Sequence, residues 1–138
     1  GIRELSGWDF VQVVSDPANA VLVVFVSRDC NACETFMVKF REVAKMVADA
    51  RRRSADAFES LVIARIDQTV NEHSETIKVT PHVRYWPRGS KKRTVDLESL
   101  SPDAVYGFLE ERTAEEIVES ADGSCEAGSG GDCSAKRR

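Results

Sequence analysis

"VLVVFVSRDCNAC", residues 21–33, joins an apolar run to two cysteines, Cys30 and Cys33. The run at residues 21–26 is short, mostly β-branched and followed at once by polar and charged residues, which is typical of a buried strand. From Cys33 the apolar side chains recur at spacings of three and four to about residue 50, which predicts an amphipathic helix. The cysteine pair therefore lies where a strand meets a helix, and it could be a metal clamp, a structural crosslink or a reactive dithiol.

The composition is that of a globular chain with one domain. Its 138 residues carry a net charge of -4 and are 42% hydrophobic, so the chain can bury a core without disulfide staples. The cysteines therefore invite a chemical explanation. The one dense basic cluster, Arg51–Arg53, ends the predicted helix, where cations favour the negative end of the helix dipole. We expect no nucleic-acid partner, and no membrane partner because no apolar run approaches the length of a bilayer span.

Further segments complete the expected domain. "WDFVQVVS", residues 8–15, predicts a short helix with Trp8, Val11 and Val14 on one side. "LVIARID", residues 61–67, predicts a second buried strand, and residues 69–78 contain enough polar helix formers for a helical turn.

The last elements are a hairpin and a helix. Residues 83–86 suit a strand that ends in the turn "PRGS", and "KRTVDL", residues 92–97, offers its partner. The Ser-Pro-Asp at residues 101–103 predicts a helix start with a hydroxyl cap and a proline in the first turn. The buried stripe of that helix is expected at Val105, Phe108 and Leu109. This order of helices and strands predicts an α/β fold, in which a central mixed β-sheet is flanked by helices on both faces.

The character of the sequence changes beyond about Glu119. "SADGSCEAGSGGDCSAKRR", residues 120–138, is rich in glycine and serine and almost without apolar side chains. We therefore expect a folded domain at residues 1–119 and a flexible tail at residues 120–138. Cys125 and Cys133 in this tail could pair with each other, exchange electrons with the first cysteine pair, or link to another chain.

Over about residues 5–112 the sequence resembles the thioredoxin superfamily, and within it the domains of protein disulfide isomerases. The resemblance rests on "VLVVFVSRDCNAC", on "ARID" in the next core strand and on "IKVTPHVRYWPRG". It implies a thioredoxin-like fold in which Pro81 is the cis-proline of the family and Gly89 closes the hairpin.

The resemblance implies a thiol–disulfide oxidoreductase of the disulfide isomerase type, with no cofactor and no metal. Cys30 would be the nucleophile, since it precedes a helix whose N–H groups stabilise a thiolate, and Cys33 would resolve the mixed disulfide. Thr80, Pro81 and His82 would form the substrate-binding loop, in which Thr80 hydrogen-bonds an extended protein segment. The expected partners are proteins with cysteines or disulfides, together with other domains of a longer oxidoreductase.

The expected location is the lumen of the endoplasmic reticulum, with the cytoplasm as the alternative. No targeting signal is visible after Gly1, and a mature or excised chain would look the same.

Several residues depart from the family pattern. Val24 stands where the family usually carries a buried acid that accepts the proton of the second cysteine. Asp29 replaces an aromatic residue, Asn31-Ala32 replaces Gly-His or Gly-Pro, and His82 replaces a small residue. We therefore expect a dithiol that is tuned differently from the isomerase pattern, or slowed.

Two alternatives remain open. The cysteines could form part of a zinc site completed by His73, His82, Cys125 or Cys133. They could also form a structural disulfide in a non-catalytic thioredoxin-like binding module, in which the groove beside Pro81 holds a partner.

Overall fold

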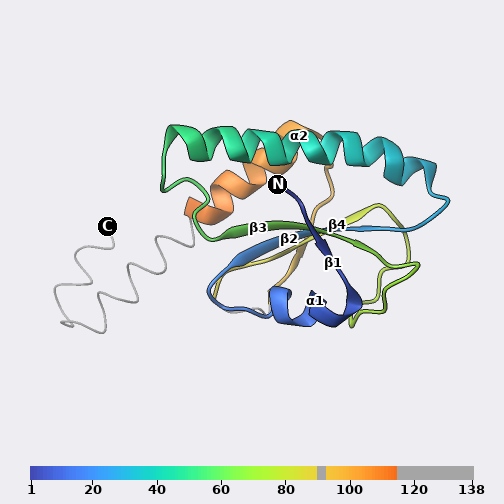
Figure 1. Ribbon diagram of the computed structural model, residues 1–138. Coiled ribbons are helices and arrows are strands. Elements are labelled where there is room, and N and C mark those ends of the chain that lie inside the picture. The colour runs from blue at the N-terminus through green and yellow to red at the C-terminus, as the bar shows by residue number, and fades with distance from the viewer. Residues whose placement is uncertain (90–92, 115–138) are drawn as a thin grey trace.

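A computed structural model of the chain describes residues 1–89 and 93–114. Their centre is a five-stranded sheet in the order β1-β3-β2-β4-β5 (Figure 1). Strand β3 runs parallel to both β1 and β2, whereas β4 runs antiparallel to β2 and β5. The strands are Arg3–Leu5 (β1), Ala20–Val26 (β2), Leu61–Asp67 (β3), His82–Trp86 (β4) and Val95–Asp96 (β5).

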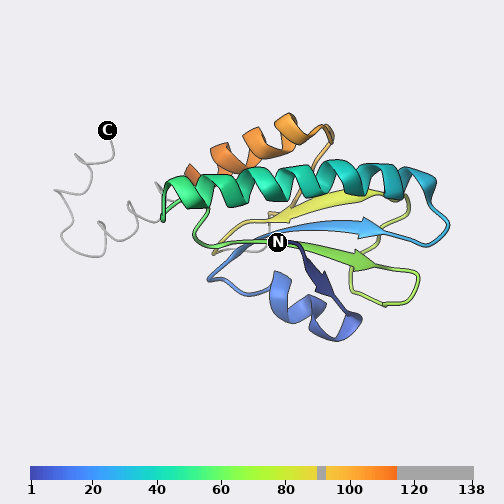
Figure 2. The same cartoon turned by 45° about the horizontal axis from the view of Figure 1, so that its top comes forward.

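Helices cover both faces of this mixed sheet, as the sequence predicts. Helix α1, Gly7–Val14, lies on one face, and α2, Asn31–Arg53, lies on the other. A further helix, described over residues 102–114, runs beside α2 on the same face (Figure 2). The arrangement confirms the predicted α/β thioredoxin-like fold.

The central strand β2 explains why its sequence is apolar throughout. It is hydrogen-bonded between β3 and β4, and all seven of its residues are buried. Leu22 and Val24 join the core beneath α2, whereas Val23 and Phe25 join the core beneath α1. A strand that is buried on both faces needs a continuous apolar run, and branched side chains pack well on a pleated surface.

Polar side chains fix where the helices begin and end. Ser6 and Asp9 form a reciprocal capping box at the start of α1. The hydroxyl of Ser101 accepts the N–H of Ala104 at 3.3 Å, which confirms the predicted start of helix 102–114. At the end of α2 the Arg51 guanidinium donates to two backbone carbonyls, of Phe58 and Leu61, at 2.7 Å each. Arg51 therefore ties the helix to the following loop as well as balancing the helix dipole.

Three local expectations differ from the structure. Strand β1 was not expected, because a three-residue edge strand with one buried side chain is too short to show a period. Residues 69–78 form turns and irregular backbone in place of a helical turn. The inner side of α1 is formed by Phe10 and Val14, while Trp8 is 85% exposed. Phe10 is on the inner side because its ring packs against Phe25 and Trp86.

The predicted tail at residues 120–138, with Cys125 and Cys133, lies outside the described residues, as do residues 90–92 of the expected hairpin. Within the described residues, we find no helix that is long and apolar enough to cross a membrane.

Candidate redox site

Cys30 and Cys33 form a disulfide at the carboxyl end of β2 and the start of α2, with their Cα atoms 5.2 Å apart. Cys30 is the N-cap residue and has an extended backbone, whereas Cys33 lies in the first helical turn. The Cys30 side chain is half-buried, and Cys33 is only 3% exposed. The pair therefore has one sulfur near the surface and one that faces the core beneath α2.

The helix start favours negative charge on the sulfur of Cys30. The Sγ atom of Cys30 accepts the backbone N–H of Cys33 at 3.0 Å, in the manner of an N-cap oxygen. The unpaired N–H groups of the first turn give this end of α2 a partial positive charge. The guanidinium of Arg28 is directed to Asp67 and not to the sulfur of Cys30, with its Nε atom 3.9 Å from Oδ2 of Asp67. Asp29 is exposed and adopts the left-handed backbone region, with φ at 55°.

Thr80, in the loop that precedes β4, lies against Cys30. The Thr80–Pro81 peptide bond is cis, and the carbonyl oxygen of Thr80 is 3.7 Å from the Sγ atom of Cys30. The hydroxyl of Thr80 donates to the same sulfur at 3.8 Å. The sulfur of Cys30 thus has two hydrogen-bond donors beside it, this hydroxyl and the N–H of Cys33, and one acceptor, the carbonyl of Thr80. Donors favour the thiolate over the thiol.

Ser27 is a member of the site that the sequence analysis missed. Its Oγ atom is 2.7 Å from the Oγ1 atom of Thr80, so the Ser27 hydroxyl can donate to Thr80 while Thr80 donates to Cys30. A signal was present, because Ser27 directly follows the buried run of β2 and stands three residues before Cys30. Its link to Thr80 spans 53 positions and could not be read from spacing.

His82 points to the neighbouring strand β5. Its Nε2 atom is 2.8 Å from the Oδ1 atom of Asp96, and the Arg84 guanidinium donates to the same oxygen at 2.6 Å. The hydrogen bond from Arg84 holds the pKa of the Asp96 carboxyl below its ordinary value, and the hydrogen bond from His82 lowers this pKa by a smaller amount. Arg84 also pairs with Glu75 at 2.7 Å. His82 therefore belongs to a charged cluster at the edge of the site.

His73, the other histidine named for a zinc site, makes its contacts away from the cysteines, and Cys125 and Cys133 lie outside the described residues. His73 hydrogen-bonds Gln68 at 2.9 Å and accepts the N–H of Glu75 at 3.1 Å, and its ring contacts Phe10 and Phe25. Burial lowers the pKa of His73, the charge of Glu75 raises it, and the charge of Arg84 lowers it further. Within residues 1–89 and 93–114, no three His, Cys, Asp or Glu side chains form a group that could hold a metal ion.

Beside the disulfide lies a cavity of about 560 Å³, here named the cysteine cavity. Both cysteines line it, and so do Val26 and Met37. Its charged wall consists of Arg28, Asp29, Glu34, Arg41, Arg65 and Asp67. Val24 is fully buried in the adjoining core, so the position of the family's usual acid is apolar here.

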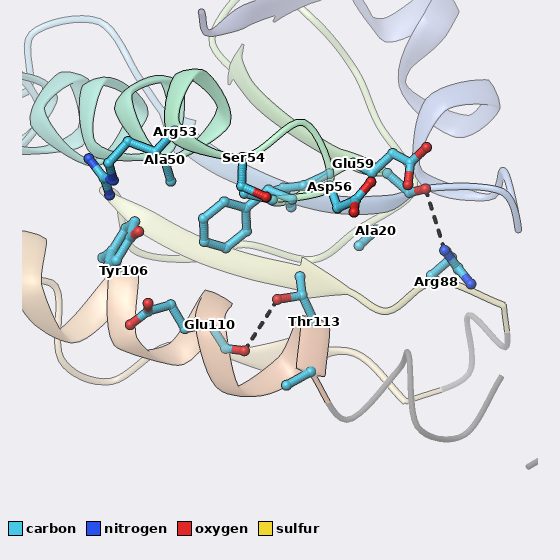
Figure 3. Close-up of a pocket in the computed structure, with 15 residues that line it drawn as sticks. Ala20, Ala50, Arg53, Ser54, Asp56, Glu59, Arg88, Tyr106, Glu110 and Thr113 are labelled. Atoms are coloured by element: carbon cyan, nitrogen blue, oxygen red, sulfur yellow. Dashed lines mark hydrogen bonds between the residues drawn. The ribbon is translucent and has the colours of Figure 1, made fainter. Parts of the chain in front are cut away.

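A second pocket, of about 450 Å³, lies away from the cysteines. Ala50 and Arg53 of α2 face Tyr106 and Glu110 of helix 102–114 across it (Figure 3). Arg88 is also at its edge, with Nη1 3.4 Å from the hydroxyl of Ser60. The pocket contains none of the predicted site residues.

Comparisons with known proteins agree with this geometry. No protein-family profile matches the chain. Protein disulfide-isomerase of Saccharomyces cerevisiae is 27% identical over 112 residues, which cover 80% of this chain and 20% of the yeast protein. Human protein disulfide-isomerase A4 is 29% identical over 127 residues, which cover 84% of this chain and 18% of that protein. The chain thus spans about a fifth of the length of these relatives.

The fold agrees with a solved domain as well. The first thioredoxin domain of mouse protein disulfide-isomerase A4 superimposes with a TM-score of 0.61 and 20% identity, covering 78% of this chain and 72% of the mouse domain. The five-stranded sheet and the disulfide at the start of α2 thus give the chain a thioredoxin-like fold, and its sequence is similar to those of protein disulfide isomerases.

Proposed function

We propose that this domain is a thiol–disulfide oxidoreductase that exchanges its Cys30–Cys33 pair with the cysteines of protein substrates. The observation that carries the proposal is the position of Cys30, which is half-buried at the N-cap of α2 and accepts the N–H of Cys33 at 3.0 Å. Thiolates are the reactive form in disulfide exchange, and helix N-termini stabilise them.

The exchange uses the two cysteines in turn. The Cys30 thiolate attacks one sulfur of a substrate disulfide, which forms a mixed disulfide and releases the other substrate sulfur as a thiolate. The Cys33 thiolate then attacks the Sγ atom of Cys30, which restores the Cys30–Cys33 disulfide and releases the second substrate thiolate. The reverse sequence transfers the disulfide to a substrate. The pair needs no cofactor for either direction.

The loop of Thr80, Pro81 and His82 is the proposed substrate-binding surface. Thr80 contacts the Sγ atom of Cys30 through both its carbonyl and its hydroxyl, so a segment that pairs with the backbone of this loop brings its own sulfur to Cys30. Backbone pairing gives affinity with little sequence selectivity. Protein segments that can adopt an extended conformation are therefore the proposed substrates.

The proposed location is the lumen of the endoplasmic reticulum, in the secretory pathway. The relatives at 27% and 29% identity are protein disulfide isomerases, and this chain covers about a fifth of each. That proportion supports a domain that works beside further domains of a longer oxidoreductase.

A non-catalytic binding module is the second candidate, and Val24 favours it. This position is fully buried and apolar, so the core beneath Cys33 holds no carboxyl group at this point of β2. In this role the disulfide would be structural and the Thr80–Pro81 loop would hold a partner. The two functions differ in whether Cys30 is reactive.

The reactivity of Cys30 tests the proposal. We expect the rate of its alkylation by iodoacetamide to be half-maximal at a pH below about 8.5, the value of an ordinary thiol, because the helix N-terminus favours the thiolate. The measurement uses the reduced chain with Cys125→Ser and Cys133→Ser, so that only the two site cysteines are present. A Cys30→Ser variant is the control for labelling of Cys33. An unreactive thiol, or one with an ordinary pH dependence, would support the binding module.

A further inference from the structure

The proposed second step requires a proton to leave Cys33, whose side chain is 3% exposed. The core on one side of it is formed by apolar residues such as Val24, Phe36 and Met37. A buried thiol in apolar surroundings resists ionisation, and only the thiolate attacks a disulfide. A proton acceptor near Cys33 would therefore speed the step.

Strand register brings a carboxylate to the side of the sheet that Cys33 faces. In the parallel pair of β2 and β3, Val24 is opposite Arg65 and Val26 is opposite Asp67. Val24 and Val26 both point to the core beneath α2, and residues opposite one another share a face. Asp67 accordingly lines the cysteine cavity, as Cys33 does.

Asp67 is held in place by its surroundings. Its Oδ1 atom accepts the backbone N–H of Thr69 at 3.0 Å, and its Oδ2 atom is 3.9 Å from Nε of Arg28. The backbone N–H of Arg28 in turn donates to the hydroxyl of Thr69 at 2.8 Å. The carboxylate is 18% exposed, so it is partly shielded from solvent while remaining in the cavity.

The charged groups around the cavity come from every element that borders it. Arg28 and Asp29 follow β2, Arg65 and Asp67 belong to β3, and Glu34 and Arg41 belong to α2. Arg65 is paired with Glu4 of the neighbouring strand β1. Asp29, before α2, and Glu34, in its first turn, are exposed. Asp67 is fixed by a backbone hydrogen bond. Asp67 is therefore the best placed of the three carboxylates that line the cavity.

We infer that Asp67 accepts the proton of Cys33 through water in the cysteine cavity when Cys33 resolves a mixed disulfide. A cavity of about 560 Å³ with charged walls has room and hydrogen-bond partners for water. The S–H proton passes to the carboxylate, the Cys33 thiolate forms the bond to Sγ of Cys30, and the bond from Cys30 to the substrate sulfur breaks. The substrate leaves as a thiolate, which takes up a proton from solvent. This inference rests on the proposed exchange activity.

The test separates the two chemical steps in one experiment. The reduced chain, with Cys125→Ser and Cys133→Ser, is mixed in a stopped-flow instrument with an equimolar aryl disulfide that releases a coloured thiolate. The first release of colour reports the attack by Cys30, and the second reports the attack by Cys33. Asp67→Asn removes the base but keeps an oxygen for the N–H of Thr69, and Glu34→Gln is the matched control from the same cavity.

For Asp67→Asn we expect the second release to slow roughly tenfold or more, somewhat below the effect typical of direct general-base catalysis because water intervenes. The first release and the Glu34→Gln variant should stay within about twofold of the parent chain, a difference too small for loss of such a base. The pH profile gives an independent readout. The second release should be nearly flat around neutral pH in the parent chain, and should rise with hydroxide concentration in Asp67→Asn.

Four results would overturn the inference. A second release at the parent rate in Asp67→Asn would exclude Asp67 as the acceptor. Equal slowing of both releases would indicate a disturbed site in place of a lost base, and slowing in Glu34→Gln alone would assign the role to Glu34. If the parent chain gives no first release, the proposed exchange activity itself fails, and the inference falls with it.

Discussion

The Cys33→Ser variant is expected to remain covalently bound to its substrate. Cys30 can still attack a substrate disulfide, but no second thiol at the site can release the mixed disulfide. We expect the complex to accumulate when the reduced variant, which also carries Cys125→Ser and Cys133→Ser, is incubated with a disulfide-bonded protein such as insulin. Non-reducing electrophoresis and intact mass measure the bound fraction.

The matched variant is Cys30→Ser, which removes the proposed nucleophile and leaves the buried Cys33, 3% exposed. It should form no complex, and its rate of disulfide exchange should fall by about a thousandfold or more, as when other catalytic nucleophiles are removed. Equal trapping by both variants would contradict the assignment of roles. Trapping by Cys30→Ser alone would reverse it.

The second large effect concerns the core that supports the site. Phe40 is fully buried on the inner face of α2, where its ring lies 5.7 Å from that of Phe36. Phe40→Ala removes this apolar surface and leaves a cavity, so we expect a loss of about 3–5 kcal/mol in the free energy of unfolding. Urea denaturation measures this loss as a lower midpoint.

Val38 provides the control on the same helix, since it is 66% exposed. Val38→Ala should change the free energy of unfolding by less than about 0.5 kcal/mol, as is usual for surface substitutions. Similar losses in both variants would show that α2 does not pack on the sheet through the face that contains Phe40.

The elements around the cysteines could be predicted from the sequence because two patterns of apolar residues are clear there. The run in β2 is apolar at every position, as a strand buried on both faces must be. The apolar residues of α2 recur with helical spacing, and seven of them are buried along one face. The position of the disulfide at the join of these elements follows directly.

The remaining features depend on tertiary contacts. Strand β1 has three residues and exists through pairing with β3, 61 positions away in the case of Arg3 and Ala64. The inner face of α1 is decided by rings on other elements that pack on Phe10. Ser27 and Asp67 join the cysteines only through strand order and register, which place residues of β2, β3 and the Thr80 loop at one end of the sheet.

The measurement that tests the account most directly is the redox equilibrium of the Cys30–Cys33 pair with glutathione, in the chain with Cys125→Ser and Cys133→Ser. The proportions of dithiol and disulfide are determined by alkylation and mass at a series of glutathione ratios. We predict a reversible transition within the range that glutathione can buffer, and its midpoint gives the direction in which the pair transfers electrons. A disulfide that glutathione cannot reduce would contradict the account and identify the pair as structural.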